Sequence, residues 1–360
     1  MTAREPGLMA TRDANPRTAP DLESRDARLL APHRRPGGGS RLAEKAGVVG
    51  FRVASWLLGR APAGPAARMI GLAAQLSYLA WPQKRRWSNA NFGHVLGLPP
   101  GHWRVRRLAL RAYGTYGRYL IEVMRLPRMT REQAEALVPS TELDPIEPIW
   151  RGSQGGLIYT LGHVGNVDMV AAGVGARFGV NVVADDSAYA ELFEDFRRDR
   201  ERWGNHIIPW RNLREIYAVL RRGEMLGLLV DWGYRPDGIP VRLFDAWTTL
   251  PAGPATLAAK TGSPILPILI RRGETRFEVG WTEPIEVAST EPAELQRATQ
   301  LMADALAAAI AAAPEQWYSF KPVWPETPEA QAELEARAAA MRAAQPMRTP
   351  DDTPPEVPAP

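Results

Sequence analysis

The chain has 360 residues, a formal net charge of +4 at pH 7 and no cysteine. The lack of cysteine excludes disulfides, a thiolate nucleophile and cysteine-ligated zinc, and it is compatible with a reducing compartment. Arginine in excess of lysine gives a pI near 9.5, which suits anionic partners such as a membrane surface, phospholipid head groups or a phosphorylated cofactor. We expect no nucleic-acid partner, because no zinc-finger, RNA-recognition or basic-zipper pattern is present.

Both ends of the chain have the composition of unfolded tails. Residues 1–43 are rich in Pro, Arg, Asp and Ser and contain "PGGGS", which predicts a disordered tail. They lack the apolar segment of a signal peptide. Residues 327–360 begin with the Ala, Glu and Arg content of a solvated helix and end in "TPPEVPAP", which predicts a second disordered tail.

Residues 44–86 contain two apolar segments that are separated by a Pro/Gly hinge at 62–65 and interrupted by arginines. The longest run without charge, residues 69–83, is shorter than the roughly 20 residues that cross a bilayer as a helix. We therefore predict two membrane-associating helices that hold a peripheral or monotopic protein on the cytoplasmic face of the cell (inner) membrane. A pair of ordinary amphipathic core helices is the alternative. The residues behind this prediction are the arginines Arg52, Arg60 and Arg68 and the aromatic anchors Trp56, Tyr78 and Trp81.

Residues 103–126 have helical periodicity, and Thr130 is placed to cap the helix that follows. From residue 155 onward, short β-rich runs alternate with helical ones. This alternation predicts an α/β domain over residues 87–326, with a single mixed sheet flanked by helices on both faces. The candidate strands are 156–162, 180–185, 205–210, 225–231, 240–244, 265–272, 276–281 and 316–320, and the candidate helices are 167–179, 189–204, 213–223 and 253–262.

His163 directly follows the predicted strand 156–162, and ligands of α/β sheets gather at the carboxyl ends of strands. Asp168 comes five residues later, and on one continuous helix the two positions would point roughly 140° apart. A turn at Gly165-Asn166 would let the imidazole and the carboxylate converge. An imidazole held by a carboxylate can accept a hydroxyl proton. The alternative is a structural histidine beside a helix-capping aspartate.

A second acid, Asp231, ends the most apolar predicted strand. A carboxylate there needs a donor to offset its desolvation, and it would lie at the same edge of the sheet as His163. Spacing alone favours Asp168 as the partner of His163, although helix entry gives Asp168 a competing role as a cap. We expect both acids near the site and leave open which one contacts the imidazole. On this reasoning Asp168→Asn lowers stability and activity together, whereas Asp231→Asn lowers kcat with little change in melting temperature.

Backbone N–H groups and one arginine are the candidates for binding a substrate. The turn that leads into the helix at Gly253 and Pro254 presents free N–H groups, as does the backbone near Gly165, and such groups can bind an anion or an oxyanion. Four arginines lie between residues 197 and 202. One of them would bind a phosphate if it reached inward.

The stretch "HVGNVD", residues 163–168, resembles the H-x4-D/E motif (HX4D) of the bacterial lysophospholipid-type acyltransferases. The branch in question contains the lipid A late acyltransferases and the phosphatidylinositol mannoside acyltransferases. Further blocks are similar to this family in order and spacing, so that the likeness covers roughly residues 45–326. These blocks are "RRWSNANFGHVLGLPP", "RAYGTYGRYLIEVMRLP", "GVNVVADDSAYAELFEDFRRDRERWGNHIIP", "LLVDWGYRPDGIPVRLFDAWTTLPAGPATLAAKTGSPILPI" and "APEQWYSFKPVWP".

The resemblance implies an O-acyltransferase that acts on membrane lipids. It would move a fatty acyl chain from acyl-CoA or acyl carrier protein to a hydroxyl of a glycolipid or phospholipid precursor, of the lipid A or phosphatidylinositol mannoside type. His163 would be the general base, Asn166 would belong to the substrate-binding turn, and Arg200 falls on a functional arginine of the second block. No cofactor and no metal would be required.

The sequence departs from the family pattern at two places. The position after Asn166 is usually Trp and is Val167 here, which affects packing. Charged residues often follow the acid of the third block, whereas Trp232 and Gly233 follow Asp231. Because that loop belongs to the expected head-group site, the second departure bears on the identity of the acceptor.

Two alternatives of other classes are left open by the residues themselves. Asp185-Asp186 follow a predicted strand, where acids can bind a divalent metal, and a metal-dependent membrane glycosyltransferase would use them. A non-catalytic lipid-binding protein is the third possibility. Metal dependence would identify the glycosyltransferase, and failure to consume an acyl thioester would identify the lipid-binding protein.

Overall fold

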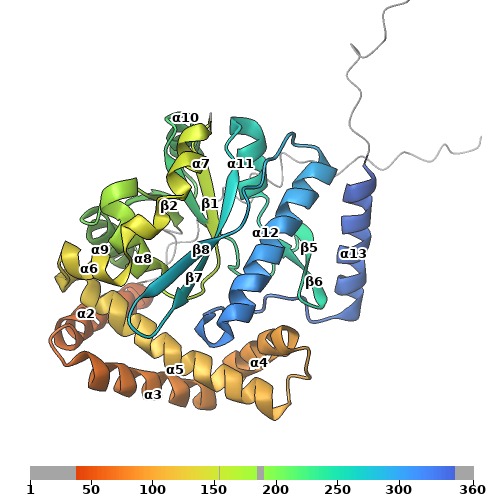
Figure 1. Cartoon of the computed structure of the whole chain (residues 1–360). Helices are drawn as coiled ribbons and strands as arrows, with labels where there is room; N and C mark the ends of the chain where they lie inside the picture. Colours follow the sequence, from red (N-terminus) through yellow and green to blue (C-terminus); the bar gives the residue numbers. More distant parts are fainter. Residues whose placement is uncertain (1–37, 154, 185–189, 345–360) are drawn as a thin grey trace, which may run out of the picture. The chain divides into compact units, whose positions relative to one another are not determined.

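The computed structural model describes residues 38–153, 155–184 and 190–344 (Figure 1). The chain divides into two compact units, Met1–Lys45 and Ala46–Pro360, and the sheet and the candidate site belong to the second. Residues 1–37 and 345–360, for which we predict disordered tails, lie outside the described residues. So do Asp185 and Asp186, on which the glycosyltransferase alternative depends.

A six-stranded mixed sheet forms the centre of the second unit, in the order β3-β2-β4-β1-β7-β8. The first five strands run parallel and β8 is antiparallel to β7. The predicted mixed α/β fold is therefore confirmed. The strands are β1 (Leu157–Leu161), β2 (Asn181–Ala184), β3 (His206–Pro209), β4 (Met225–Leu229), β7 (Ile265–Arg272) and β8 (Phe277–Trp281).

The prediction of a single sheet is wrong, because β5 (Ile239–Leu243) and β6 (Ala246–Leu250) pair only with each other. Two residues join them, and Phe244 in this turn has a φ of 55°, the left-handed backbone that tight hairpins require. The buried side of the hairpin packs against α12 (Pro292–Ala312) instead of extending the main sheet. The predicted strand 316–320 is wrong as well. It forms one isolated antiparallel bridge, between Trp317 and Val164, just beyond the end of β1.

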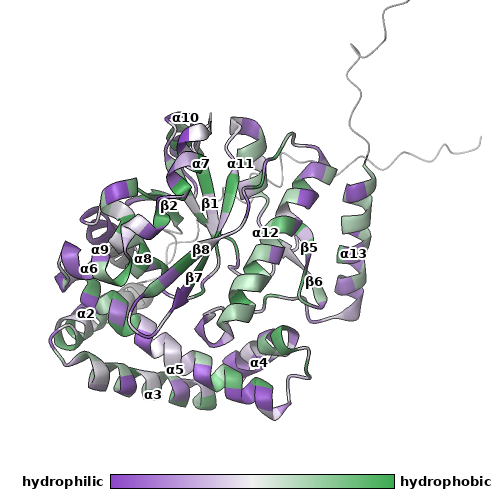
Figure 2. Ribbon diagram, viewed as in Figure 1, coloured by the Kyte–Doolittle hydropathy of each residue, from purple (hydrophilic) through white to green (hydrophobic). Residues whose placement is uncertain are grey.

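Helices cover both faces of the main sheet, as predicted. Along β1 the buried side chains alternate: Leu157 and Leu161 join the apolar cluster of α8 (Val167–Phe178), whereas Ile158 joins that of α10 (Leu213–Arg221). Figure 2 shows hydrophobic residues along β1, as expected for a strand buried on both faces. The other helices in contact with these clusters are α6 (Arg131–Leu137) and α7 (Ile146–Gly152) on the first face and α11 (Gly253–Thr261) and α12 on the second. Thr130 caps α6, as predicted.

The helices preceding the sheet pack through small residues. A Cβ on Gly117 would lie 2.5 Å from the Cα of Gly71, so glycine at these positions allows two helices to approach closely. The break between the first two helices lies at residues 59–62, slightly before the predicted hinge at 62–65, and residues 63–65 already belong to the second helix. None of the helices in the described part of the chain is long and apolar enough to cross a membrane. The elements are α2 (Gly38–Leu58), α3 (Ala63–Ala80), α4 (Pro82–Leu96) and α5 (Trp103–Arg125), of which α3 and α5 hold the two glycines.

The predicted helix near the carboxyl end is present as α13 (Pro328–Ala343), but it is not solvated on all sides. Leu334 and Ala338 are buried, and the helix contacts α12 and the β5–β6 hairpin. Their spacing of four residues places both on one face of the helix. This packing attaches the segment after residue 326 to the rest of the fold.

Candidate active site

The candidate site lies where β1 and β4 end side by side. The two strands are parallel neighbours, with Leu161 opposite Leu229, so the residues that follow them leave the sheet at the same edge. His163 follows β1 and Asp231 follows β4. Gly162 leaves room beside them, because a Cβ at that position would clash with Leu306 Cδ1 and lie 3.1 Å from Asp231 Oδ2.

Asp231, and not Asp168, contacts the imidazole of His163. Asp231 Oδ1 lies 2.6 Å from His163 Nδ1, and Oδ2 accepts the backbone N–H of His163 at 2.9 Å. The indole N–H of Trp317 donates to Oδ2 at 2.8 Å. The Asp231 side chain has no exposed surface, whereas that of His163 is 30% exposed. Nδ1 is thus held by the carboxylate, and Nε2 is the nitrogen left for chemistry.

Burial and the ion pair act on the pKa of each group in opposite directions. Burial lowers the pKa of His163, but the charge and hydrogen bond of Asp231 outweigh it, so the pKa lies above the usual 6.5. Burial raises the pKa of Asp231, and the charge of His163 together with three donated hydrogen bonds brings it below 3.8. The carboxylate therefore stays ionised over the range in which the imidazole titrates.

Asp168 lies in the first turn of α8 and is bound by two other side chains. Its Oδ1 lies 2.9 Å from Arg200 Nε and 2.6 Å from Nη2, and Oδ2 accepts the Tyr119 hydroxyl at 3.0 Å. The capping role considered for Asp168 belongs to Asn166, whose Oδ1 accepts the N–H of Met169 at 3.1 Å. Asn166 has the extended backbone of a capping residue, whereas Asp168 is already helical.

We expect Asp168→Asn to lower the free energy of unfolding by about 1–3 kcal/mol, because it removes the carboxylate that pairs with the partly buried Arg200 guanidinium. Urea unfolding of the purified chain measures the difference. Asp144→Asn is the matched control, since it removes a carboxylate from Arg177 where the side chain of Asp144 is 61% exposed, and such pairs contribute little. Equal destabilisation by the two substitutions would contradict the prediction.

Gly165 lines the pocket, but its own N–H is not available to a substrate. This N–H donates to the carbonyl of Gln316 at 3.0 Å. The φ of Gly165 is 71°, and a Cβ there would lie 2.7 Å from Ile270, so the turn requires glycine. The N–H groups at the start of α8 have no acceptor within the helix. Val167, the first residue of α8, also lines the pocket.

Glu122 on α5 anchors the turn from behind and was missed by sequence reasoning. Its Oε2 accepts the Asn166 side-chain N–H at 2.9 Å, and its Oε1 lies 3.1 Å from Arg272 and 3.3 Å from Arg118. Glu122 therefore fixes the residue that caps α8. The sequence contained one signal for Glu122: it is the first Asp or Glu after Glu44, so it stands out as the acid that ends a long stretch without acids.

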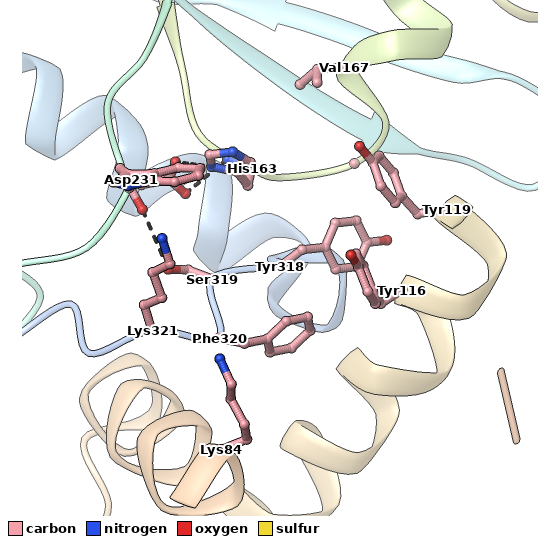
Figure 3. A pocket seen from close by; sticks show the side chains of 12 residues that line it. Lys84, Tyr116, Tyr119, His163, Val167, Asp231, Tyr318, Ser319, Phe320 and Lys321 are labelled. Carbon is pink, nitrogen blue, oxygen red and sulfur yellow. Dashed lines mark hydrogen bonds and ion pairs between the residues drawn. The ribbon is translucent and has the colours of Figure 1, made fainter. Parts of the chain in front are cut away.

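A pocket of about 300 Å³ opens beside His163 (Figure 3). Aromatic side chains from two segments form one wall: the rings of Tyr116 and Tyr318 are 5.4 Å apart, and those of Tyr116 and Phe320 are 5.2 Å apart. Lys321 lies 3.7 Å above the ring of Trp232. The lining residues are Lys84, Tyr116, Tyr119, His163, Gly165, Val167, Asp231, Trp232 and the run Tyr318–Lys321.

Not every residue predicted for the site lines this pocket. Arg200 and Asn166 lie behind it, bound to Asp168 and Glu122 respectively. Gly253 and Pro254 begin α11, as predicted, but they are not among the described residues that line the pocket, and Pro254 is buried. Residues 318–320, predicted as part of a strand, instead contribute to its wall together with Lys321.

The model of the family "Bacterial lipid A biosynthesis acyltransferase" matches residues 54–326. The chain is 29% identical over 283 residues to the phosphatidylinositol mannoside acyltransferase of Mycolicibacterium smegmatis. This match covers 75% of this chain and 89% of that protein. It is also 29% identical over 244 residues to the phosphatidylinositol mannoside acyltransferase of Mycobacterium tuberculosis (strain CDC 1551 / Oshkosh), covering 65% and 75% of the two chains.

Proposed function

The chain belongs to the bacterial lipid A biosynthesis acyltransferase family, and from this we propose that it transfers a fatty acyl chain from a thioester to a lipid hydroxyl. The family and its relatives make it an acyltransferase. The donor would be acyl-CoA or acyl carrier protein, and the acceptor a glycolipid or phospholipid precursor. The observation that carries the proposal is the hydrogen bond between His163 Nδ1 and the buried Asp231, beside a pocket.

In the proposed reaction, neutral Nε2 of His163 accepts the proton of the acceptor hydroxyl as its oxygen attacks the thioester carbonyl. Asp231 stabilises the imidazolium that forms, as a buried carboxylate does in other imidazole bases. The tetrahedral intermediate collapses with breakage of the carbon–sulfur bond. The imidazolium then returns its proton to the departing thiolate, so that an ester and a free thiol are the products and no covalent enzyme intermediate is needed.

The oxyanion would be stabilised at the start of α8. The first N–H groups of a helix lack acceptors within it and carry the positive end of the helix dipole. Val167 lines the pocket, and Asn166, held by Glu122, fixes the position of this helix end. This replaces Gly165 as the proposed donor, because the N–H of Gly165 is already bound to Gln316.

The location that goes with this function is peripheral, on the cytoplasmic face of the membrane, and sequence and exposure support the membrane contact. Residues 45–121 contain no Asp or Glu, so positive charge there is uncompensated by local acids. Large apolar side chains on the same helices are exposed, which a membrane interface would cover. The exposed residues on α2 and α3 are Val49, Val53, Trp56, Leu57, Met69, Leu72, Leu76 and Leu79.

Replacing Leu72, Leu76 and Leu79 together by Gln is expected to weaken vesicle binding by about 10²-fold or more, because each exposed Leu that inserts into lipid contributes roughly 1 kcal/mol or more. Cosedimentation of the full chain with vesicles measures this. The control variant replaces Leu213 and Leu301, which are exposed outside α2 and α3. If the triple variant binds as tightly as the wild type, the helices do not form the membrane contact.

The activity itself is tested with the full-length protein in detergent or vesicles, supplied with acyl-CoA or acyl carrier protein and candidate lipid acceptors. Mass spectrometry should find an acceptor that has gained one acyl chain together with an equivalent of free thiol. The reaction should proceed in the presence of EDTA. Transfer of a sugar from a nucleotide sugar only when a divalent metal is added would favour the glycosyltransferase, and lipid binding without loss of thioester would favour a non-catalytic protein.

A further inference from the structure

A second cavity, with a volume of about 690 Å³, borders the same two segments that line the pocket at His163. On α4, Lys84 lines the first pocket, and Arg86 lines the second. In the segment after Trp317, Lys321 lines the first and Pro322 the second. The residues that line the two cavities are therefore only one or two positions apart along the chain, and a group held in the second cavity remains near His163.

Two guanidinium groups from different helices line the second cavity. Arg86 comes from α4 and Arg106 from α5, and neither forms an ion pair with any residue that the structure describes. Both lie within the acid-free stretch 45–121. Glu326 is the carboxylate among the lining residues, so two guanidinium groups face one acid. Arginine in this setting binds a planar or tetrahedral anion, phosphate above all.

The remaining walls are aromatic and polar, and they are held rigidly. Trp324 is buried, donates its indole N–H to the carbonyl of Leu243 at 3.3 Å and stacks on His94 with ring centroids 4.5 Å apart. His94 Nδ1 is bound to Asp245 at 2.8 Å. Gln83 and Trp87 also line the cavity. Aromatic faces and amides suit a ring bearing hydroxyls or a heterocyclic base.

Asn91 ties the two cavities to one another. Its side-chain N–H groups donate to the carbonyls of Ser319 at 3.0 Å and Lys321 at 2.7 Å, and its Oδ1 accepts the N–H of Val323 at 3.2 Å. The buried Asn91 thereby fixes the segment whose one end forms the wall of the first pocket and whose other end forms the wall of the second.

We propose that the second cavity binds the phosphate ester of a substrate, with Arg86 and Arg106 on the phosphate and the aromatic and amide walls on the group that bears it. The volume lies within the range of small-molecule sites. This inference rests on the proposed acyl transfer, since both of its substrates can supply the group. The acceptor supplies it as the head group of an anionic phospholipid, and the donor as the nucleotide of coenzyme A.

The test uses two soluble probes, dihexanoylphosphatidylinositol for the lipid head group and adenosine 3′,5′-bisphosphate for the donor. Isothermal titration calorimetry of the detergent-solubilised full chain measures their affinities. The double variant Arg86→Gln with Arg106→Gln should bind the probe about 10²-fold more weakly than the wild type, roughly tenfold for each charge-assisted contact that is lost. The matched control is Arg104→Gln with Arg107→Gln. It removes two exposed charges from the same acid-free stretch and from residues that do not line the cavity.

Binding of the phosphatidylinositol probe alone assigns the site to the acceptor, and binding of the bisphosphate alone assigns it to the donor. If both double variants lose affinity for the probe equally, the probe is attracted by the basic surface in general and the proposal is overturned. Failure of the wild type to bind either probe also overturns it. Thermal unfolding checks that each variant is folded, and the single variants replace the double one if it melts early. If neither probe binds while acyl transfer persists, the phosphate site is wrong and the proposed function is retained. If probe binding depends on Arg86 and Arg106 but no acyl transfer occurs, the proposed function is wrong.

Discussion

His163→Ala is expected to reduce acyl transfer by about 10² or more, as loss of a general base does. The substitution removes Nε2, the only nitrogen of the ring not held by Asp231, while Asp231 keeps the indole N–H of Trp317 and the backbone N–H at position 163. The protein should therefore remain folded. Initial rates with acyl-CoA or acyl carrier protein, measured beside thermal unfolding, give the result.

His206→Ala provides the control, since His206 is an exposed imidazole that lies 4.0 Å from Glu201. It should have wild-type rates. Near-normal turnover by well-folded H163A protein would remove the central claim about the mechanism. A loss that appears equally in H206A would show that the assay responds to histidine content or stability rather than to the base.

Asp231→Asn is expected to lower kcat by about 10² or more and to shift the pH dependence of the rate. In the wild type, activity should fall as the pH drops through the raised pKa of His163, because the base must be neutral. The Asn variant lacks the negative charge that raises this pKa. Its acidic limb should therefore move to lower pH even though its maximal rate is smaller. An unchanged acidic limb in a folded variant would mean that Asp231 does not control the imidazole.

The structure also changes the stability expected of this variant. The sequence suggested little loss of melting temperature, but Asp231 is buried and accepts three hydrogen bonds. An Asn side chain turns an NH2 group toward one of these donors, so we expect the melting temperature of D231N to fall.

The difference in stability between the wild type and D231N should depend on pH in a defined way. The lowered pKa of Asp231 stabilises the fold above its unfolded value, and this contribution is lost as the pH falls through the folded pKa. The raised pKa of His163 stabilises the fold below its unfolded value, and this contribution is lost as the pH rises through the folded pKa. The free energy of unfolding of the wild type should therefore exceed that of D231N by the largest amount between about pH 4 and pH 6.5. A difference that is constant across pH would contradict the coupling.

The amino-acid sequence by itself determined the six strands of the main sheet, the helices α8 to α11 and the edge of the sheet that carries the site. Strand and helix periods are set by local side-chain spacing, so the alternation after residue 155 predicted a mixed α/β fold and both of its covered faces. It also placed His163 and Asp231 at the ends of two strands, where parallel neighbours leave the sheet together.

Only the tertiary structure decided which residues meet at that edge. The contacting pair His163 and Asp231 is separated by 68 residues in the sequence. The pair Trp317 and Asp231 is separated by 86 residues, and the pair Asn166 and Glu122 by 44 residues. The nearer acid, Asp168, is turned by the first turn of α8 toward Arg200 and Tyr119. Such pairings depend on strand order and on the packing of α5 and the 316–321 segment against the end of β1. No spacing along the chain encodes them, because their free energy comes from burying distant side chains together.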